Sequence, residues 1–275
     1  MATSLTGTRN IAYLLVAFTG FISIFYMFFF PSHNKITPEF VIALGDSITQ
    51  QGSDPESNGW LTQLQYKYNR KLDILNRGYS GYNSRLVLKH ALQDIPPSSN
   101  IKAKLVTIFL GANDAVYDQH QQYVSLDEYK SNLQQLVTYF LNRDYDSLIL
   151  VITPPPIEVD ALTKRNLIRH KPLDRSNERT GLYAQAALQI ASNNYDHYNN
   201  RVIGVDLFSA LGGGGGGGGT TTGDTGKYLS DGLHLNKEGN NELYKLIQTT
   251  LDKTRVASDQ LNFRTPAWID LINEK

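Results

Sequence analysis

The sequence predicts an α/β fold, a three-layer sandwich built on a mainly parallel five-stranded sheet. The first observation is that short apolar runs alternate along the chain with segments of helical spacing. Parallel strands in such repeats need right-handed crossovers, so helices must cover both faces of the sheet. The second observation is length, since roughly 240 of the 275 residues follow an N-terminal apolar segment, enough for one such domain with a full core.

An uncharged apolar segment, IAYLLVAFTGFISIFYMFFF, occupies residues 11–30. About 20 apolar residues in a helix cross a hydrocarbon core of ~30 Å. A cleaved signal peptide and a buried core helix are the alternatives. A signal peptide has a shorter apolar region and a small-residue cleavage site, whereas bulky Phe residues and Pro31 stand at this boundary. We therefore expect a single-pass N-terminal transmembrane anchor at 11–30, between a tail (1–10) and a linker (31–37), in an endomembrane and with undetermined orientation.

Apolar runs after this segment predict the strands, and helical segments lie between them. The predicted strands are at 40–45, within 71–81, within 104–114, within 147–156 and at 201–208. The predicted helices are at 59–69, at 84–95, from 126 onward, at 177–194 and at 237–253. Paired or triple prolines end the second helix and the fourth strand, because proline cannot donate a backbone hydrogen bond.

The helix from residue 126 has the strongest pattern. Its apolar residues recur every three or four positions and so form one face, namely Leu126, Tyr129, Leu133, Leu136, Val137, Phe140 and Leu141. Ser125, followed three residues later by Glu128, predicts a capping box at its start.

We expect the α/β domain to span residues 38–256 and a C-terminal tail to span 257–275. Within the domain, Gly212–Gly219 form a homopolymeric run. Glycine loses the most entropy on ordering, so 212–226 is predicted to be a flexible loop. The run lacks the spacing and the Lys-Ser/Thr pair of a phosphate-binding loop, and its role stays open.

Composition excludes several functions. The formal net charge is +0, with 26 basic and 26 acidic residues interspersed, which argues against a nucleic-acid partner. There are no cysteines, so disulfides, thiolate metal sites and a cysteine nucleophile are excluded.

Polar motifs follow four of the predicted strands. Ser47 follows the first, SGYN the second, GAND the third and DGLH the fifth, after the glycine run. Ligands of such folds gather beyond the carboxyl ends of the strands. The motifs are therefore expected to converge on one site.

Ser47 is the candidate nucleophile of this site. A serine hydroxyl needs an adjacent base, and His234 is the best-placed histidine. Asp231, three residues earlier, is within reach of the other imidazole nitrogen and would fix its tautomer. The order Ser, Asp, His is that of α/β-hydrolases, although the Gly-x-Ser-x-Gly motif is absent.

Acyl transfer also needs donors for the developing oxyanion. The backbone N–H of Ser47 is one. Gly81 offers a second, since a residue without Cβ lets the backbone approach a substrate, and the Asn113 side chain offers a third.

Each motif also has a purely structural interpretation, because Gly-Asp-Ser, Asn-Asp and Asp-Gly are common in turns. Asp46 is expected to bond its own loop. The other five histidines have no acid comparably placed at a strand end. A metal site from His90, His120 and Asp118 has no supporting ligand spacing, so neither a metal nor a cofactor is expected.

Taken together, these motifs resemble the SGNH, or GDSL-type, hydrolases. GDSIT is similar to their first block, NRGYSGYNSR to the second, GAND to the third and DGLH to the fifth. The resemblance implies a flavodoxin-like SGNH fold, with Ser47 as nucleophile and Asp231 and His234 completing the triad. Gly81 and Asn113 match the oxyanion donors, with Gly78 as the alternative to Gly81.

VITPPPI, DRSNERTGLYAQAA and TPAWIDL resemble segments of the isoamyl acetate-hydrolysing esterase subgroup. That resemblance implies hydrolysis of short-chain esters, typically acetates, without a metal. The N-terminal apolar segment and the glycine run depart from the pattern.

The predicted function is that of a serine esterase acting on small acetate-type esters. One alternative is a membrane-tethered lysophospholipase or thioesterase that takes longer acyl chains. Another is an inactive binding module. The oligomeric state is left open.

Overall fold

The computed structural model describes residues 37–214 and 224–272. Its centre is a five-stranded, wholly parallel sheet in the order β2-β1-β3-β4-β5. The strands are β1 (Glu39–Gly45), β2 (Asp73–Gly78), β3 (Lys102–Phe109), β4 (Leu148–Ile152) and β5 (Val202–Val205). The predicted α/β class and parallel sheet are confirmed.

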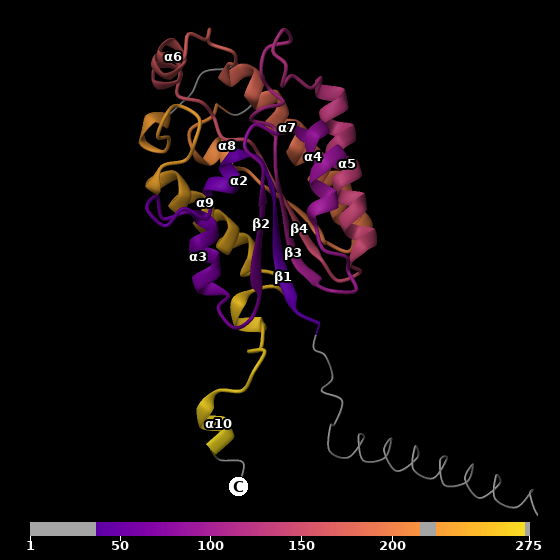
Figure 1. The fold of residues 1–275 in the computed structure, drawn as a ribbon. Helices are drawn as coiled ribbons and strands as arrows, with labels where there is room; N and C mark the ends of the chain where they lie inside the picture. Colours follow the sequence, from indigo (N-terminus) through magenta and orange to yellow (C-terminus); the bar gives the residue numbers. More distant parts are fainter. Residues whose placement is uncertain (1–36, 215–223, 273–275) are drawn as a thin grey trace, which may run out of the picture. The chain divides into compact units, whose positions relative to one another are not determined.

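The register aligns the carboxyl ends of the central strands. Gly45, the last residue of β1, lies beside Gly78 of β2 and beside Phe109 of β3. Phe109 in turn lies beside Ile152 of β4. The loops that follow these strands therefore leave the sheet at one edge, the end at which α2 (Ser47–Gln51) and α6 (Val159–Ile168) lie in Figure 1.

Helices cover both faces of the sheet, as predicted (Figure 1). One layer contains α3 (Trp60–Lys67), α8 (Leu207–Ala210) and α9 (Lys237–Leu251). The other contains α4 (Ser84–His90), α5 (Leu126–Arg143) and α7 (Asn177–Tyr195). Alternate residues of β1 supply the two cores: Val41 and Ala43 belong to the first, and Ile42 and Leu44 to the second.

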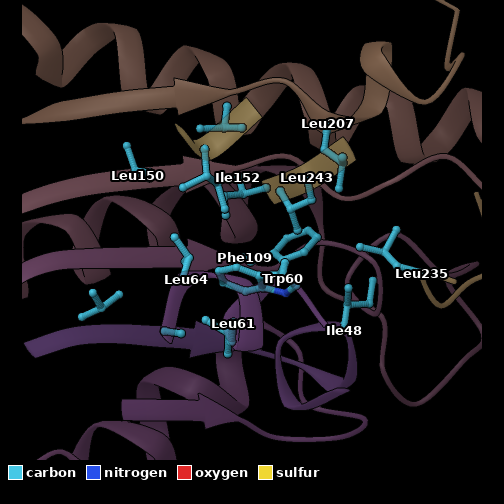
Figure 2. Packing of buried hydrophobic residues seen from close by; sticks show 14 of the residues in the cluster. Ile48, Trp60, Leu61, Leu64, Phe109, Leu150, Ile152, Leu207, Leu235 and Leu243 are labelled. Atoms are coloured by element: carbon cyan, nitrogen blue, oxygen red, sulfur yellow. The ribbon is translucent and has the colours of Figure 1, made fainter. Parts of the chain in front are cut away.

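The core under α3 and α9 is built around Trp60. Its ring meets the Phe109 ring edge to face at 6.5 Å, and Leu64 and Leu243 pack beside them (Figure 2). All four side chains are buried. Burial of large apolar side chains is the main stabilising term here, at roughly 1.5–3 kcal/mol each.

On the other face, α5 buries the predicted apolar stripe, although Leu126 is only partly buried. The Ser125 hydroxyl accepts from the Glu128 N–H at 3.3 Å, which is half of the predicted capping box. The Glu128 carboxylate pairs instead with the Arg85 guanidinium, at 2.6 and 2.7 Å. A bidentate charged pair replaces the reciprocal half of the box.

Other helices differ from the prediction. The segment 84–95 is an α-helix only as far as His90 and then tightens into the 3₁₀ turn η1 (Ala91–Asp94). The short helices α2, α6, α8 and α10 (Trp268–Ile272) were not predicted. The remaining 3₁₀ turns are η2 (Asp196–Tyr198), η3 (Thr225–Lys227) and η4 (Ser258–Gln260).

Two predicted features fall outside the described residues: the apolar segment 11–30 and most of the glycine run, 215–219. Within 37–214 and 224–272, no helix combines the length and apolar character needed to cross a bilayer. The N-terminal anchor stays a prediction, as do the domain boundaries.

Candidate active site

Ser47 is presented by the sharp turn between β1 and α2. A Cβ on Gly45 would lie 2.1 Å from the Thr49 hydroxyl and 2.6 Å from the Phe109 carbonyl oxygen, so only glycine fits. Asp46 caps α2, accepting from the Ile48 N–H at 2.9 Å, which is the structural role predicted for it. Ser47 is the first residue of the helix and is 7% exposed. Its hydroxyl is thus held by the backbone at the sheet edge.

A tight loop presents Asp231 and His234. The loop closes through an antiparallel bridge between Leu229 and Leu235, and the Ser230 N–H donates to the His234 carbonyl at 2.8 Å. Gly232, at its tip, has φ +82°. Non-glycine residues rarely adopt this conformation, so the glycine permits the turn that brings acid and base together.

The three predicted triad residues meet. Nε2 of His234 lies 2.9 Å from Oγ of Ser47, which is 187 residues away in the chain. Nδ1 of His234 lies 2.9 Å from Oδ2 and 3.1 Å from Oδ1 of Asp231. A carboxylate can only accept, so Nδ1 carries the proton and Nε2 is left to accept from the serine hydroxyl. The arrangement can therefore deprotonate Ser47 during an attack.

Asp231 is held in its ionised form. Partial burial works against its charge, but hydrogen bonds from the His234 ring and backbone, and from Arg165, outweigh it and hold the pKa of Asp231 well below its usual range. Oδ1 accepts from the Leu233 and His234 N–H groups at 3.1 and 2.9 Å. Nη1 of Arg165 donates to Oδ2 at 2.9 Å.

The loop after β2 brings Gly81 to this edge. Gly81 has φ +81°, and its carbonyl accepts from the Gln122 side chain at 2.7 Å. Its N–H has no partner among the described residues. The N–H of the alternative donor, Gly78, instead donates to Oδ1 of Asn76 at 2.9 Å. The geometry favours Gly81 over Gly78 as the free donor.

Asn113 follows β3 and is 5% exposed. Its amide donates one N–H to the Tyr82 carbonyl at 2.9 Å, which ties it to the loop that carries Gly81. An amide nitrogen has two N–H groups. The second has no partner in the described part of the chain, so it can serve a ligand.

Two further carboxyl groups lie buried beneath the site. Burial raises the pKa of Asp46 to about 7 and that of Asp114 to about 6. Asp114 accepts from the Ser84 N–H at 2.9 Å, while its Oδ2 has no partner among the described residues. Near neutral pH these groups are therefore partly protonated.

The histidine and acid cluster considered for a metal makes ordinary polar contacts. Asp118 pairs with Arg179, and His120 lies 3.7 Å from the Asp174 carboxylate. Over 37–214 and 224–272, no group of three metal-binding side chains occurs.

Arg165 and its helix, α6, were missed at the sequence level. Only Leu162 and Asn166 of that helix are buried, so it has almost no apolar stripe to detect. The contact with Asp231 spans 66 residues. Neither a sequence motif nor a hydrophobic period predicts this contact.

Known proteins resemble this chain over most of its length. Residues 43–241 match the GDSL-like Lipase/Acylhydrolase family. An isoamyl acetate-hydrolyzing esterase 1 homolog of Mus musculus is 36% identical over 241 residues, 86% of this chain and 89% of the relative. A GDSL esterase/lipase of Arabidopsis thaliana is 33% identical over 238 residues, 83% of this chain and 91% of the relative.

Among solved structures, an acetylxylan esterase from Geobacillus stearothermophilus aligns with a TM-score of 0.54 at 21% identity. The alignment covers 77% of this chain and 93% of the other. At this identity the likeness is one of fold.

Proposed function

Since the chain belongs to the GDSL-like lipase/acylhydrolase family and is a carboxylic ester hydrolase, we propose that it cleaves short-chain, acetate-type esters through Ser47, His234 and Asp231. The observation that carries the proposal is the 2.9 Å distance between Ser47 Oγ and His234 Nε2. The start of α2 and the loop before α9, far apart in sequence, supply these atoms. A hydrogen bond of this kind is the requirement for activating a serine hydroxyl.

In the first half-reaction, Ser47 Oγ attacks the ester carbonyl carbon while His234 Nε2 takes its proton. The imidazolium that forms is stabilised by the ionised Asp231 carboxylate. The carbonyl oxygen becomes an oxyanion, and His234 then protonates the departing alcohol. The serine is left acylated.

The oxyanion is stabilised by N–H groups that have no other partner among residues 37–214 and 224–272. Those of Ser47 and Gly81 are backbone groups, and the third is the second N–H of the Asn113 amide. Since these groups are held before substrate arrives, they need little reorganisation during the reaction.

In the second half-reaction, His234 takes a proton from water. The hydroxide attacks the acyl carbon, the bond to Ser47 Oγ breaks, and His234 returns a proton to the serine. Acid and free enzyme are released. The chain's own residues supply every proton transfer.

The preference for acetates is supported by the mouse relative, whose name gives isoamyl acetate as its ester. The acyl preference is tested with p-nitrophenyl esters from acetate to palmitate. We expect kcat/KM to be highest for acetate and to fall with chain length. A steep rise toward palmitate would contradict the proposal and favour the long-chain alternative.

The nucleophile is tested with Ser47→Ala and a fluorophosphonate probe. We expect the wild-type protein to be labelled at Ser47, and Ser47→Ala to be unlabelled and to lose at least about 10³-fold in kcat. Ser131→Ala, at an exposed position of α5, is the control and should behave as wild type. Esterase activity that survives in Ser47→Ala would overturn the assignment.

A further inference from the structure

Helix α6 packs directly on the loop that carries Asp231. The Glu158 N–H, at its N-cap, donates to the Gly232 carbonyl at 3.0 Å. A Cβ on Gly232 would lie 2.4 Å from the Leu162 nitrogen and 2.5 Å from the Glu158 carbonyl oxygen. Backbone touches backbone, so the position of the loop depends on the position of the helix.

One turn after Leu162, Arg165 extends from the same helix to the acid. Its Nη1 donates to Asp231 Oδ2 at 2.9 Å, and that same oxygen is 2.9 Å from His234 Nδ1. The two paired side chains are 14% and 29% exposed. An ion pair that is mostly buried is screened less than a surface pair.

We infer that Arg165 is a positioning residue of the triad: it holds the Asp231 carboxylate against His234, and its charge disfavours protonation of the imidazole. This inference rests on the proposed function, because it assigns Arg165 a role in the same site. In the described part of the chain Arg165 makes no hydrogen bond to Ser47, and it is not assigned a role in bond making.

The electrostatic part follows from the charged groups that face the imidazole. Asp231 faces it from its own loop, and Asp46 faces it from the start of α2. Both carboxylates favour the protonated ring. Arg165, on α6, is a cation that offsets the charge of Asp231, and Arg175 acts on Asp46. Without the Arg165 charge the imidazole should bind its proton more tightly. As pH falls, it should therefore become protonated, and stop acting as a base, at a higher pH than in the wild-type protein.

The test compares kcat/KM against pH for p-nitrophenyl acetate in the full chain. Arg165→Met keeps the aliphatic stem and removes the charge. We expect the acid limb to move up by about half to one pH unit. We also expect kcat/KM at neutral pH to fall about tenfold, with most of the change in kcat.

Two variants serve as controls. Lys164→Met removes the same charge one residue earlier on α6, from an exposed side chain, and should leave the limb where it is. Arg165→Lys restores the charge and should return the limb toward its wild-type position. If the acid limb of the pH profile lies at the same pH in Arg165→Met and in wild type, the inference is overturned, even if the rate falls. Lost packing alone would lower the rate without moving the acid limb.

A second measurement does not depend on turnover. The ring titration of His234, followed by NMR in the substrate-free protein, should shift upward in Arg165→Met and remain in place in Lys164→Met. If Ser47→Ala keeps esterase activity while the ring titration shifts, the proposed function fails and the coupling stands. If the enzyme behaves as proposed and the ring does not shift, only the role of Arg165 fails.

Discussion

Asp46, the residue directly before Ser47, combines a structural role with a perturbed charge. It caps α2 and is 2% exposed, and burial raises its pKa to about 7. In the unfolded chain it would titrate near 4. Between these values the folded protein keeps a proton that the unfolded chain releases, so the free energy of unfolding must fall as pH rises through this window.

We expect Asp46→Asn to remove much of that fall. Asparagine still caps the helix. As pH increases from 4 to 7, the free energy of unfolding of the variant should rise by about 2–4 kcal/mol relative to that of wild type. Urea unfolding at several pH values measures it. Asp54→Asn is the control, because Asp54 is only partly buried and hydrogen bonds from Ser57 and Glu56 lower its pKa. If the free energy of unfolding changes with pH in the same way in Asp46→Asn and in wild type, the prediction is contradicted.

A second prediction at this scale concerns Asn113. Asn113→Ala removes one proposed oxyanion donor and also leaves the Tyr82 carbonyl without its partner. Loss of one such donor should lower kcat about 10²–10³-fold, with a much smaller change in KM. The measurement is steady-state kinetics with p-nitrophenyl acetate. Asn142→Ala, at an exposed position of α5, should be neutral, and a wild-type kcat in Asn113→Ala would exclude the donor role.

Sequence reasoning reached Ser47, His234 and Asp231 because each follows a predicted strand and the chemistry requires all three together. It left Gly78 and Gly81 unresolved, since the choice depends on which N–H already has a partner. Arg165 could not be predicted, because its role comes from one contact across 66 residues.

At the scale of elements, predictability followed the amount of apolar surface. Helices that bury a full stripe, such as α5 and α9, were found close to their observed bounds. Short helices such as α2 and α6 bury only a few residues and are stabilised by caps at Asp46 and Glu158. Caps are local and common, so they predict a helix weakly. It is nevertheless these short helices that present Ser47, the proposed nucleophile, and contact Asp231.

Gly232 and Gly81 provide a test of how closely α6 packs on the active-site loop. Both have φ near +80°, at +82° and +81°. An added Cβ on Gly232 would meet the backbone of Leu162 at 2.4 Å, whereas on Gly81 it would meet only the Gln122 side chain, at 3.6 Å.

Gly81→Ala should therefore lower the free energy of unfolding only by the cost of a left-handed backbone conformation in alanine, roughly 1–2 kcal/mol. Gly232→Ala carries the same term and a clash with α6, and should cost at least about 2 kcal/mol more. Thermal and urea unfolding of the two variants measures the difference. Equal destabilisation would mean that α6 is not tightly packed on this loop.

At the scale of the whole molecule, the pattern of segments predicted five parallel strands, whereas their order was implied only by the resemblance to a flavodoxin-like fold. Strand pairing depends on the faces that the crossover helices cover, and single segments do not encode that. The sequence also did not predict the path of the chain after α9. Arg264 makes a bidentate pair with Asp73 of β2, at 2.6 and 2.7 Å, and Lys71 contacts the Ser258 carbonyl. Residues expected to form a tail thus contact the first half of the domain.

Tyr68 tests how much this closure contributes to stability. It is the C-cap residue of α3 and fully buried, and its hydroxyl donates to the Val256 carbonyl at 2.8 Å, across 188 residues. Tyr68→Phe keeps the ring but leaves a carbonyl without its partner, so we expect a loss of about 1–2 kcal/mol in the free energy of unfolding. For a domain of this size that is a fall of about 2–8 °C in the melting temperature. Tyr66→Phe makes the same change at a site 87% exposed and should have almost no effect. If the two variants have the same melting temperature, the hydrogen bond to the Val256 carbonyl contributes nothing to stability.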